Sequence, residues 1–415
     1  MPYQPRIVDS ELASRLEASG AVVIEGPKAC GKTETARQRA SSEVLLDIDQ
    51  NARQAVAVDP GLVLVGPTPR LIDEWQVEPE IWNQVRREVD ARKQAGQFIL
   101  TGSAVPPDDA RRHSGAGRIS HVRMRPMSLF ELGYSNGNAP LAGLLAGENF
   151  QASDPGLTVG DLAREVSLGG WPGLRGLEPD QGLIAVRDYL DEICRVDVNR
   201  VDNSERNPDK IFQLVRSLAR NTTTYASAKS LATDAGDDGA LNDRTVRVYL
   251  DLLSRLMIVE NQPSWAPHLR SRYRLRSAPK WLFVDPSIAV AALRATPKRL
   301  LGDLNLFGLL FESMIIRDLR VYAQANDAQV LQYRDSNDHE VDAIIETADG
   351  RWAAIEIKLG TGQIDFGASQ LKRFVEQIDL SKCGHPAALA IITATGYGYR
   401  RTDGIQVIPA GALGP

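Results

Sequence analysis

Short apolar runs alternate with amphipathic segments over the first hundred residues of the chain. Between two of these runs, residues 78–96 carry Ile81, Val85 and Val89 four positions apart and end at Gly96, a pattern that predicts an amphipathic helix. The apolar runs read as buried strands, and they lie within residues 21–26, 43–49, 61–75 and 97–103. Alternating strands and helices predict a parallel α/β sheet that is covered on both faces.

The pattern changes after residue 135. A stretch rich in turn residues follows, residues 181–260 have mainly helical periodicity, and about the last 110 residues return to mixed α and β patterns. We therefore predict an α/β protein of three parts, with boundaries at residues 1–135, 136–285 and 286–415.

Composition narrows the class of protein. The chain has 43% hydrophobic and 24% charged residues and a formal net charge of −5, so any surface for nucleic acid must be a local patch. Cys30, Cys194 and Cys383 are scattered, which argues against a disulfide framework or a zinc site. The start of the sequence lacks a signal-peptide pattern, and no apolar run approaches the roughly 20 residues of a membrane span. These features predict a cytoplasmic protein with no membrane partner.

A phosphate-binding pattern follows the first predicted strand. The stretch "GPKACGKT" supplies Gly26, Gly31, Lys32 and Thr33 between a strand and a helix. The glycines allow backbone N–H groups to surround phosphate oxygens, Lys32 adds positive charge, and the Thr33 hydroxyl is a ligand for Mg²⁺. ATP and Mg²⁺ are the expected cofactors.

Two later strand ends complete this candidate site. In "RLIDEW", Asp73 is expected to hold the hydration shell of Mg²⁺ and Glu74 to polarise the attacking water. In "FILTGS", Thr101 and Ser103 end the next strand, where they are predicted to sense the γ-phosphate. Capping of the following segment is the alternative role for this pair.

The N-terminal part resembles the AAA-type ATPases. The matching stretches are "GPKACGKT", "LIDEWQ", "FILTGS" and "GAGRISHVRMRPMSLFELG". They look like those of a prokaryotic group of ATP-binding proteins that carry a C-terminal domain of uncharacterised function. The resemblance implies that Arg118 contacts the γ-phosphate, either in the same chain or from a neighbouring subunit of a homo-oligomer. Glu34 departs from the pattern, since the group has a second small hydroxyl residue there.

The middle of the chain contains a candidate DNA reader. Residues 227–263 read as helix, turn and helix, with Asn242 or Asp243 as the N-cap of the second helix. Arg244 and Arg247 lie in its first turns, where a recognition helix presents side chains to a groove.

An arginine-rich segment follows the second helix. Alternating arginines point the same way from a strand, as in the wing of a winged helix-turn-helix, and they are Arg270, Arg272, Arg274 and Arg276. Residues 241–280 carry a local net charge of +5. DNA is the predicted partner. The alternative is a solvated edge strand beside an ordinary helical hairpin.

Residues 340–358 predict a β-hairpin with a charged face. With a turn at residues 348–350, Asp342 lies opposite Glu356, and Lys358 shares their face. The residues that alternate with them and can face a core are Ala343, Ile345, Ile355 and Ile357.

This constellation is the D…ExK pattern of the PD-(D/E)xK nuclease-like fold. In that fold Asp342 and Glu356 would bind Mg²⁺, or Mn²⁺ in its place, and Lys358 would orient the attacking water. Glu312 lies in a preceding helix that often supplies a further acid in the fold. An ordinary charged hairpin face is the alternative.

Together these patterns predict an ATPase that hydrolyses ATP with Mg²⁺ and binds or processes DNA, with metal-dependent cleavage as a further activity. One rival is a signalling or regulatory ATPase whose last domain is a non-catalytic binding module. The other is a DNA-binding regulator that has lost the chemistry at both ends.

Overall fold

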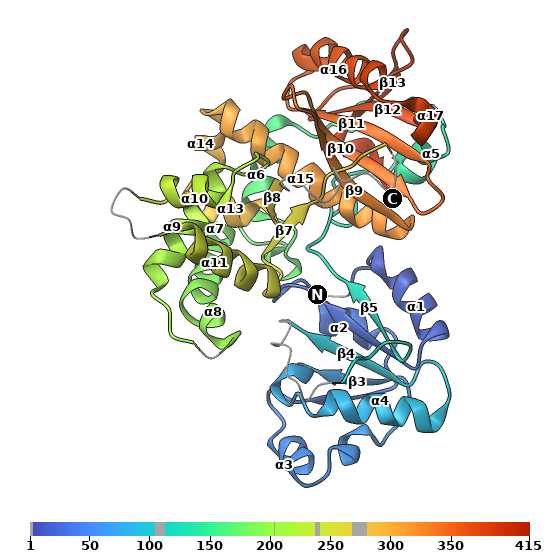
Figure 1. The fold of residues 1–415 in the computed structure, drawn as a ribbon, viewed down its shortest axis with the longest axis vertical. Helices are drawn as coiled ribbons and strands as arrows, with labels where there is room; N and C mark the ends of the chain where they lie inside the picture. The colour runs from blue at the N-terminus through green and yellow to red at the C-terminus, as the bar shows by residue number, and fades with distance from the viewer. Residues whose placement is uncertain (1–2, 104–112, 203, 237–240, 268–279) are drawn as a thin grey trace.

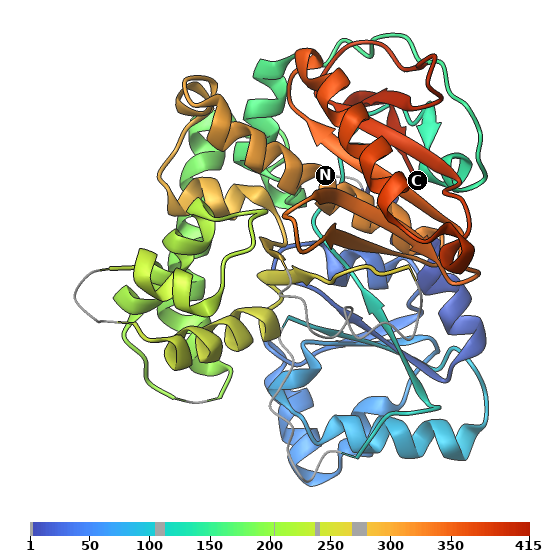
Figure 2. The same ribbon diagram turned by 45° about the horizontal axis from the view of Figure 1, so that its top comes forward.

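A computed structural model describes residues 3–103, 113–202, 204–236, 241–267 and 280–415 of the chain. Figure 1 shows an N-terminal α/β domain in blue, a group of central helices in green and yellow, and a C-terminal α/β domain in orange and red. Figure 2 gives the same arrangement with the C-terminal domain turned towards the viewer.

The N-terminal domain is built on a parallel five-stranded sheet. In spatial order its strands are β2 (Ser42–Leu45), β3 (Arg70–Asp73), β4 (Phe98–Gly102), β1 (Ala21–Glu25) and β5 (Ile119–Arg123). Around them are the helices α1 (Val8–Ala18), α2 (Lys32–Arg37), α3 (Gln50–Val58) and α4 (Ile81–Arg92), with 3-10 turns at Pro60–Leu64 and Trp75–Val77. Ala21 and Val23 pack in one core, whereas Val22 and Ile24 pack in another. The predicted parallel sheet, buried on both faces, is therefore confirmed.

The central region is helical and ends in a β-hairpin. Its elements are α6 (Val159–Leu168), a 3-10 turn (Pro172–Leu174), α7 (Pro179–Glu192), the π-helical turn η4 (Ile193–Asp197), α8 (Val198–Arg200), α9 (Pro208–Arg220), α10 (Ala228–Asp234), α11 (Asp243–Arg255), β7 (Val259–Gln262) and β8 (Lys280–Phe283). Asn242 caps α11, because its side chain accepts a hydrogen bond from the Thr245 N–H. The strands β7 and β8 pair in antiparallel fashion, with Gln262 opposite Lys280.

The C-terminal domain is a six-stranded mixed sheet between two helices. The strands lie in the order β13 (Tyr399–Arg400), β14 (Gln406–Pro409), β12 (Ala388–Thr393), β11 (Trp352–Lys358), β10 (Glu340–Thr347) and β9 (Ala328–Arg334). The long helix α15 (Leu304–Ala325) packs on one face and α16 (Ile364–Gln377) on the other; the short α17 (Leu380–Cys383) follows α16. Apolar side chains alternate between the two faces of β10 and β11, so both faces need a cover. Ile345 and Ile355 pack in the core on the α15 side, whereas Trp352 and Ala354 pack in the core on the α16 side.

Packing in the structure crosses two of the predicted boundaries. The helices α13 (Pro286–Ala292) and α14 (Pro297–Leu301) pack on α6 or α7 of the central region, so that region extends past residue 285. In the other direction, β6 (Ala139–Pro140) pairs with β15 (Leu413–Gly414), and α5 (Leu141–Leu145) packs on β11 and α15. Burial of apolar side chains such as Val290 and Leu144 against these distant partners decides both boundaries.

The central hairpin is joined to the edge of the C-terminal sheet. The Trp265 N–H donates to the Gln332 carbonyl oxygen at 2.7 Å, and the Gln332 N–H donates to the Pro263 carbonyl oxygen at 2.9 Å. Trp265 itself is buried in the core of the C-terminal domain. The edge strand β9 is thus covered by the chain that leaves β7. The arginine-rich segment predicted to form the wing lies outside the described residues.

Candidate functional site

The phosphate loop lies between β1 and α2. Gly31 has φ +103°, a conformation that glycine adopts without strain, and it turns the chain into the helix. The Lys32 ammonium is buried and donates to the carbonyl oxygens of Gly26 and Pro27, both at 2.9 Å. The loop therefore holds this cation in place before phosphate oxygens become its partners.

Asp73 is the centre of a buried oxygen cluster beside the loop. Thr33 donates its Oγ1 hydrogen to Asp73 Oδ1 at 2.9 Å, and the Thr101 hydroxyl donates to the same oxygen. Parallel neighbours β3 and β4 bring Asp73 and Thr101 to one edge of the sheet. Hard oxygen donors at one point suit Mg²⁺, so the residues Thr33 and Asp73 fit the expected ion. Thr101 is fully buried and orients Asp73.

Glu74 adopts a left-handed conformation, with φ +52°. A non-glycine residue in this region is strained, and such strain is concentrated at functional sites. Ser103 donates to Glu74 Oε2 at 3.0 Å, and Gln76 bonds to the same oxygen. Glu74, the residue after Asp73, and Ser103, at the end of the next strand, are therefore in contact.

A cavity of about 840 Å³ opens in front of these side chains. The N-terminal domain contributes Lys32, Thr33, Glu74 and Ser103 to its wall. The opposite wall comes from the central region and consists of Pro172, Gly173, Asp197, Arg200, Val201 and Leu256. Glu34, the departure from the expected pattern, also lines the cavity and forms an ion pair with Arg37. The cavity is therefore shared by two parts of the chain.

Two central residues contact the phosphate loop directly. The Lys28 ammonium lies 2.6 Å from Asp197 Oδ1, and the Tyr189 hydroxyl donates to the Lys28 carbonyl oxygen at 3.2 Å. Asp197 ends the π-helical turn, and π turns are frequent at functional sites. Sequence reasoning missed both residues, because a lone aspartate or tyrosine in a helical segment carries no recognisable pattern.

Arg118 lies at the wrong end of the sheet for a contact with phosphate in its own chain. It precedes β5, and its carbonyl oxygen accepts from the N–H of Ala21, the first residue of β1. The phosphate loop follows the other end of β1, five residues or about 16 Å away. The Arg118 side chain pairs instead with Asp90 at 2.9 Å. This position favours the alternative of a contact from a neighbouring subunit, and both alternatives stay predictions.

The two predicted DNA contacts on α11 are accessible. Arg244 and Arg247 are exposed, and Arg247 forms an ion pair with Asp243 one turn earlier at 3.2 Å. The apolar stripe on the other face of the helix, which includes Val246 and Leu250, is buried. The remaining predicted contacts, Arg270, Arg272, Arg274 and Arg276, lie outside the described residues.

The C-terminal hairpin has the predicted register. Ala343 pairs with Ile355 and Ile345 with Ala353, which sets Asp342 against Glu356. The Lys358 ammonium lies 3.1 Å from Asp342 Oδ2 and 2.5 Å from Glu356 Oε2, and Asp342 also accepts from the Ile357 N–H at 2.8 Å. The three side chains of the D…ExK pattern therefore converge on one point.

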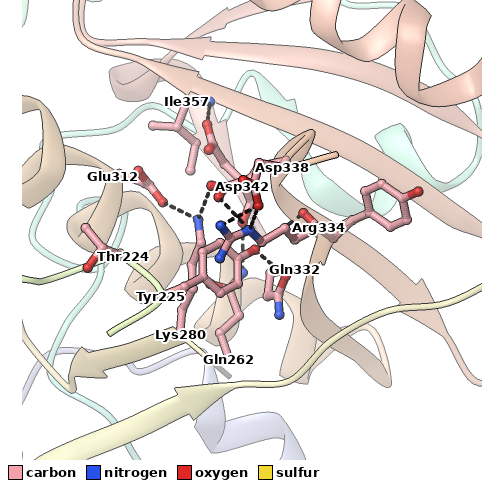
Figure 3. Close-up of polar contacts among 12 residues, drawn as sticks. Thr224, Tyr225, Gln262, Lys280, Glu312, Gln332, Arg334, Asp338, Asp342 and Ile357 are labelled. Atoms are coloured by element: carbon pink, nitrogen blue, oxygen red, sulfur yellow. Dashed lines mark hydrogen bonds and ion pairs between the residues drawn. The ribbon is translucent and has the colours of Figure 1, made fainter. Parts of the chain in front are cut away.

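A second lysine, Lys280, which the sequence analysis counted only in the charge of residues 241–280, enters the same site. Figure 3 shows Lys280 between Tyr225, Glu312 and Asp342. Its ammonium lies 3.3 Å from Glu312 Oε1, 3.9 Å from Glu340 Oε2 and 5.1 Å from the centre of the Tyr225 ring. No local pattern signals this placement, because it depends on how β8 docks on the C-terminal domain.

Burial and close charges shift the protonation of this cluster. Burial, helped by the neighbouring Asp342 charge, raises the pKa of Glu356 to about 8. Burial also raises the pKa of Glu312 to about 7, although Lys280 opposes the shift. For Asp342 burial is outweighed by the ammonium groups of Lys358 and Lys280, so its pKa is lowered. The ammonium groups of Lys358 and Lys280 thus favour the charged form of the Asp342 carboxylate.

In the structure, lysine side chains lie beside the carboxylates that were predicted to bind a metal ion. Among the described residues, no three His, Cys, Asp or Glu side chains come together in a way that would hold a metal. The oxygens of Asp342 and Glu356 face the Lys358 ammonium, and Glu312 faces that of Lys280. Lys358 and Lys280 therefore neutralise the carboxylates beside them, and metal binding by Asp342 and Glu356 stays a prediction.

Comparison with protein family models agrees with the phosphate site of the N-terminal domain. Residues 18–133 match the family model of an AAA domain. Over these residues the N-terminal part is similar to an AAA domain. Residues 159–299 and 307–413 match two models, each described as a domain of unknown function, DUF8612 and DUF4143. The AAA domain is thus followed by two parts whose family descriptions give no activity.

No curated protein matches the chain. Among solved structures, the Walker-type ATPase PABY2304 of Pyrococcus abyssi is 11% identical, with 69% of this chain and 94% of that chain covered and a TM-score of 0.43. The Drosophila ORC bound to DNA is 12% identical, with coverage of 69% and 85% and a TM-score of 0.18. Assignment of the AAA domain therefore rests on its family match and its phosphate site. No helix among the described residues is long and apolar enough to cross a membrane.

Proposed function

We propose that this protein is a Mg²⁺-dependent ATPase whose turnover is coupled to DNA binding by the central region. The observation that carries the first part is the shared Asp73 oxygen, which accepts hydrogen bonds from Thr33 and Thr101 next to the buried Lys32. Magnesium would be bound by the Thr33 hydroxyl and, through water molecules of its hydration shell, by Asp73. It would supply positive charge at the β- and γ-phosphates.

The other residues of the site have separate roles. Lys32 exchanges its two carbonyl partners for phosphate oxygens and offsets their charge. Glu74 is the group that polarises the attacking water, and Ser103 together with Gln76 holds its carboxylate in place. This assignment is the reason to expect hydrolysis in addition to binding.

The test separates binding from turnover. Lys32→Ala should abolish ATP binding in calorimetry, whereas Glu74→Gln should bind ATP normally and lose about a hundredfold or more of its turnover. Glu80→Gln, an exposed acid nearby, is the matched control and should hydrolyse ATP at the wild-type rate. Normal hydrolysis by Glu74→Gln would overturn the role given to that residue.

Support for DNA binding comes from the exposed arginines on α11 and from the positive charge of residues 241–280. Helix dipole and guanidinium groups at the start of a helix suit the phosphates of a duplex. Fluorescence anisotropy with labelled duplex DNA should give an affinity that falls with salt and differs between ATP and ADP. An affinity without salt dependence would favour the rival reading of a regulatory ATPase that binds a protein.

Cleavage of DNA by the C-terminal domain is a second candidate, favoured by the convergence of Asp342, Glu356 and Lys358. Its test is incubation of the protein with plasmid and linear DNA, with and without ATP and Mg²⁺ or Mn²⁺. Nicking should vanish in Asp342→Asn while ATP turnover persists. A complete lack of nicking would leave this domain as a non-catalytic binding module.

A further inference from the structure

Lys280 is a buried cation at the start of β8. The residue is 1% exposed, although lysine is almost never fully buried unless it is paired. It belongs to β8 of the central region, yet its ammonium contacts Glu312 of α15 and Glu340 of β10, both in the C-terminal domain. Burial of the long side chain therefore serves contacts across two parts of the chain.

The backbone around Lys280 is fixed to the C-terminal sheet. Its partner in the hairpin is Gln262, whose Nε2 donates to the carbonyl oxygens of Asp342 at 2.9 Å and Leu331 at 3.0 Å. On the other side, the Tyr225 ring covers the ammonium, and the Tyr225 hydroxyl donates to Gln332 Oε1. Figure 3 shows Lys280 enclosed by these side chains. The ammonium is thus set in place by polar contacts on several sides.

The carboxyl groups of this cluster share two ammonium groups. Four carboxyl groups, those of Glu312, Glu340, Asp342 and Glu356, surround two ammonium groups. Lys358 pairs with two of them and Lys280 with the other two. Clustered buried carboxylates repel one another unless a cation lies among them. A divalent ion would perform the same task, with the same kind of oxygen ligand.

We propose that Lys280 is a tethered cation that excludes divalent metal from the C-terminal site. The central region thereby controls whether this site can take up Mg²⁺ or Mn²⁺. The inference concerns the site of the second candidate function and rests on its D…ExK geometry. It does not depend on ATP hydrolysis.

The test compares metal binding before and after removal of the cation. Thermal unfolding is followed without nucleotide, with and without MnCl₂, for wild type, Lys280→Met and Lys280→Gln. In the wild type, Mn²⁺ should cause no change in melting temperature that depends on Asp342. Both variants should melt at a lower temperature than wild type, and Mn²⁺ should restore several degrees by mass action. The exposed Lys298→Met on α14 is the matched control and should behave as wild type.

A double variant tests whether Mn²⁺ binds at the C-terminal site. Adding Asp342→Asn to Lys280→Met should remove the Mn²⁺ shift. A wild-type Mn²⁺ shift that Asp342→Asn abolishes would overturn the proposal, because metal and Lys280 would then coexist. The proposal would also be overturned if the folded Lys280 variants showed no rise in melting temperature when Mn²⁺ is added. ATP turnover of Lys280→Met, measured in parallel, tests the ATPase separately and should equal that of wild type.

Discussion

The Lys28 ammonium of the phosphate loop lies 2.6 Å from the Asp197 carboxylate of the central region. Asp197 is buried, whereas the Lys28 side chain is 43% exposed, so the lysine is the partner that is free to move. Both residues line the cavity in front of the loop. A phosphate group that attracted Lys28 would weaken its hold on Asp197. Together with the hydrogen bond from Tyr189 to the Lys28 carbonyl oxygen, this ion pair joins the phosphate loop to the central helices.

The link predicts an effect on nucleotide affinity. Asp197→Asn removes a carboxylate from the wall of the cavity and releases Lys28 towards phosphate. Affinity for ADP should rise about twofold to fivefold, the range expected for a partly exposed ion pair. Calorimetric titration measures this, with Asp191→Asn, an exposed acid on α7, as the control. Weaker binding by Asp197→Asn would instead mean that the carboxylate holds the loop in its binding conformation.

DNA binding should depend on the arginine-rich segment. Changing Arg270, Arg272, Arg274 and Arg276 together to alanine removes four guanidinium groups. The slope of log affinity against log salt should flatten by about three to four, since each phosphate contact contributes about 0.9. Anisotropy titrations at several salt concentrations measure the slope, and the exposed Arg299→Ala on α14 should leave it unchanged. An unchanged slope in the fourfold variant would favour the alternative interpretation of this segment as an ordinary solvated strand.

A buried ion network around Arg317 should dominate stability where the central region meets α15. The Arg317 guanidinium lies 2.8 Å from Asp285 Oδ2 and 2.8 Å from Asp318 Oδ1, and all three side chains are buried. Arg317→Met leaves two buried carboxylates without their cation, which costs about 3–5 kcal/mol. The melting temperature should fall by several degrees, whereas Arg299→Met should leave it unchanged. Equal melting temperatures would show that the network contributes little.

Glu260 predicts how stability responds to acid. Burial alone would raise its pKa, but Arg125, Arg123 and Arg320 outweigh burial and lower the pKa well below the ordinary value of 4.5. A lowered carboxylate pKa stabilises the folded state above the ordinary value, and this contribution is lost as pH falls below 4.5.

The matching experiment compares wild type with Glu260→Gln. At pH 7 the variant should melt at a lower temperature, because three guanidinium groups lose their shared anion. The difference in melting temperature between the two proteins should shrink as pH falls below 4.5. A difference that stays constant from pH 7 to pH 3 would contradict the assigned charge on Glu260.

The sequence by itself determined what short-range physics controls. Alternating apolar runs defined the buried strands of the AAA domain, and the glycines and Lys32 of the phosphate loop identified its ligand. The turn at residues 348–350 defined the hairpin register, because side chains in a strand repeat every two residues. Asn242 was recognisable as one of two candidate caps by its side chain alone.

The tertiary structure decided everything that depends on how distant elements dock. Asp197 reaches Lys28 across 169 positions of sequence, and Lys280 reaches Glu312 from another part of the chain. Arg118, which looked like a phosphate ligand, lies at the opposite edge of the sheet. The docking of β8 likewise adds the Lys280 ammonium to the predicted D…ExK site. Periodicity specifies which face of an element is buried, but the partner that covers this face is chosen by packing over the whole chain.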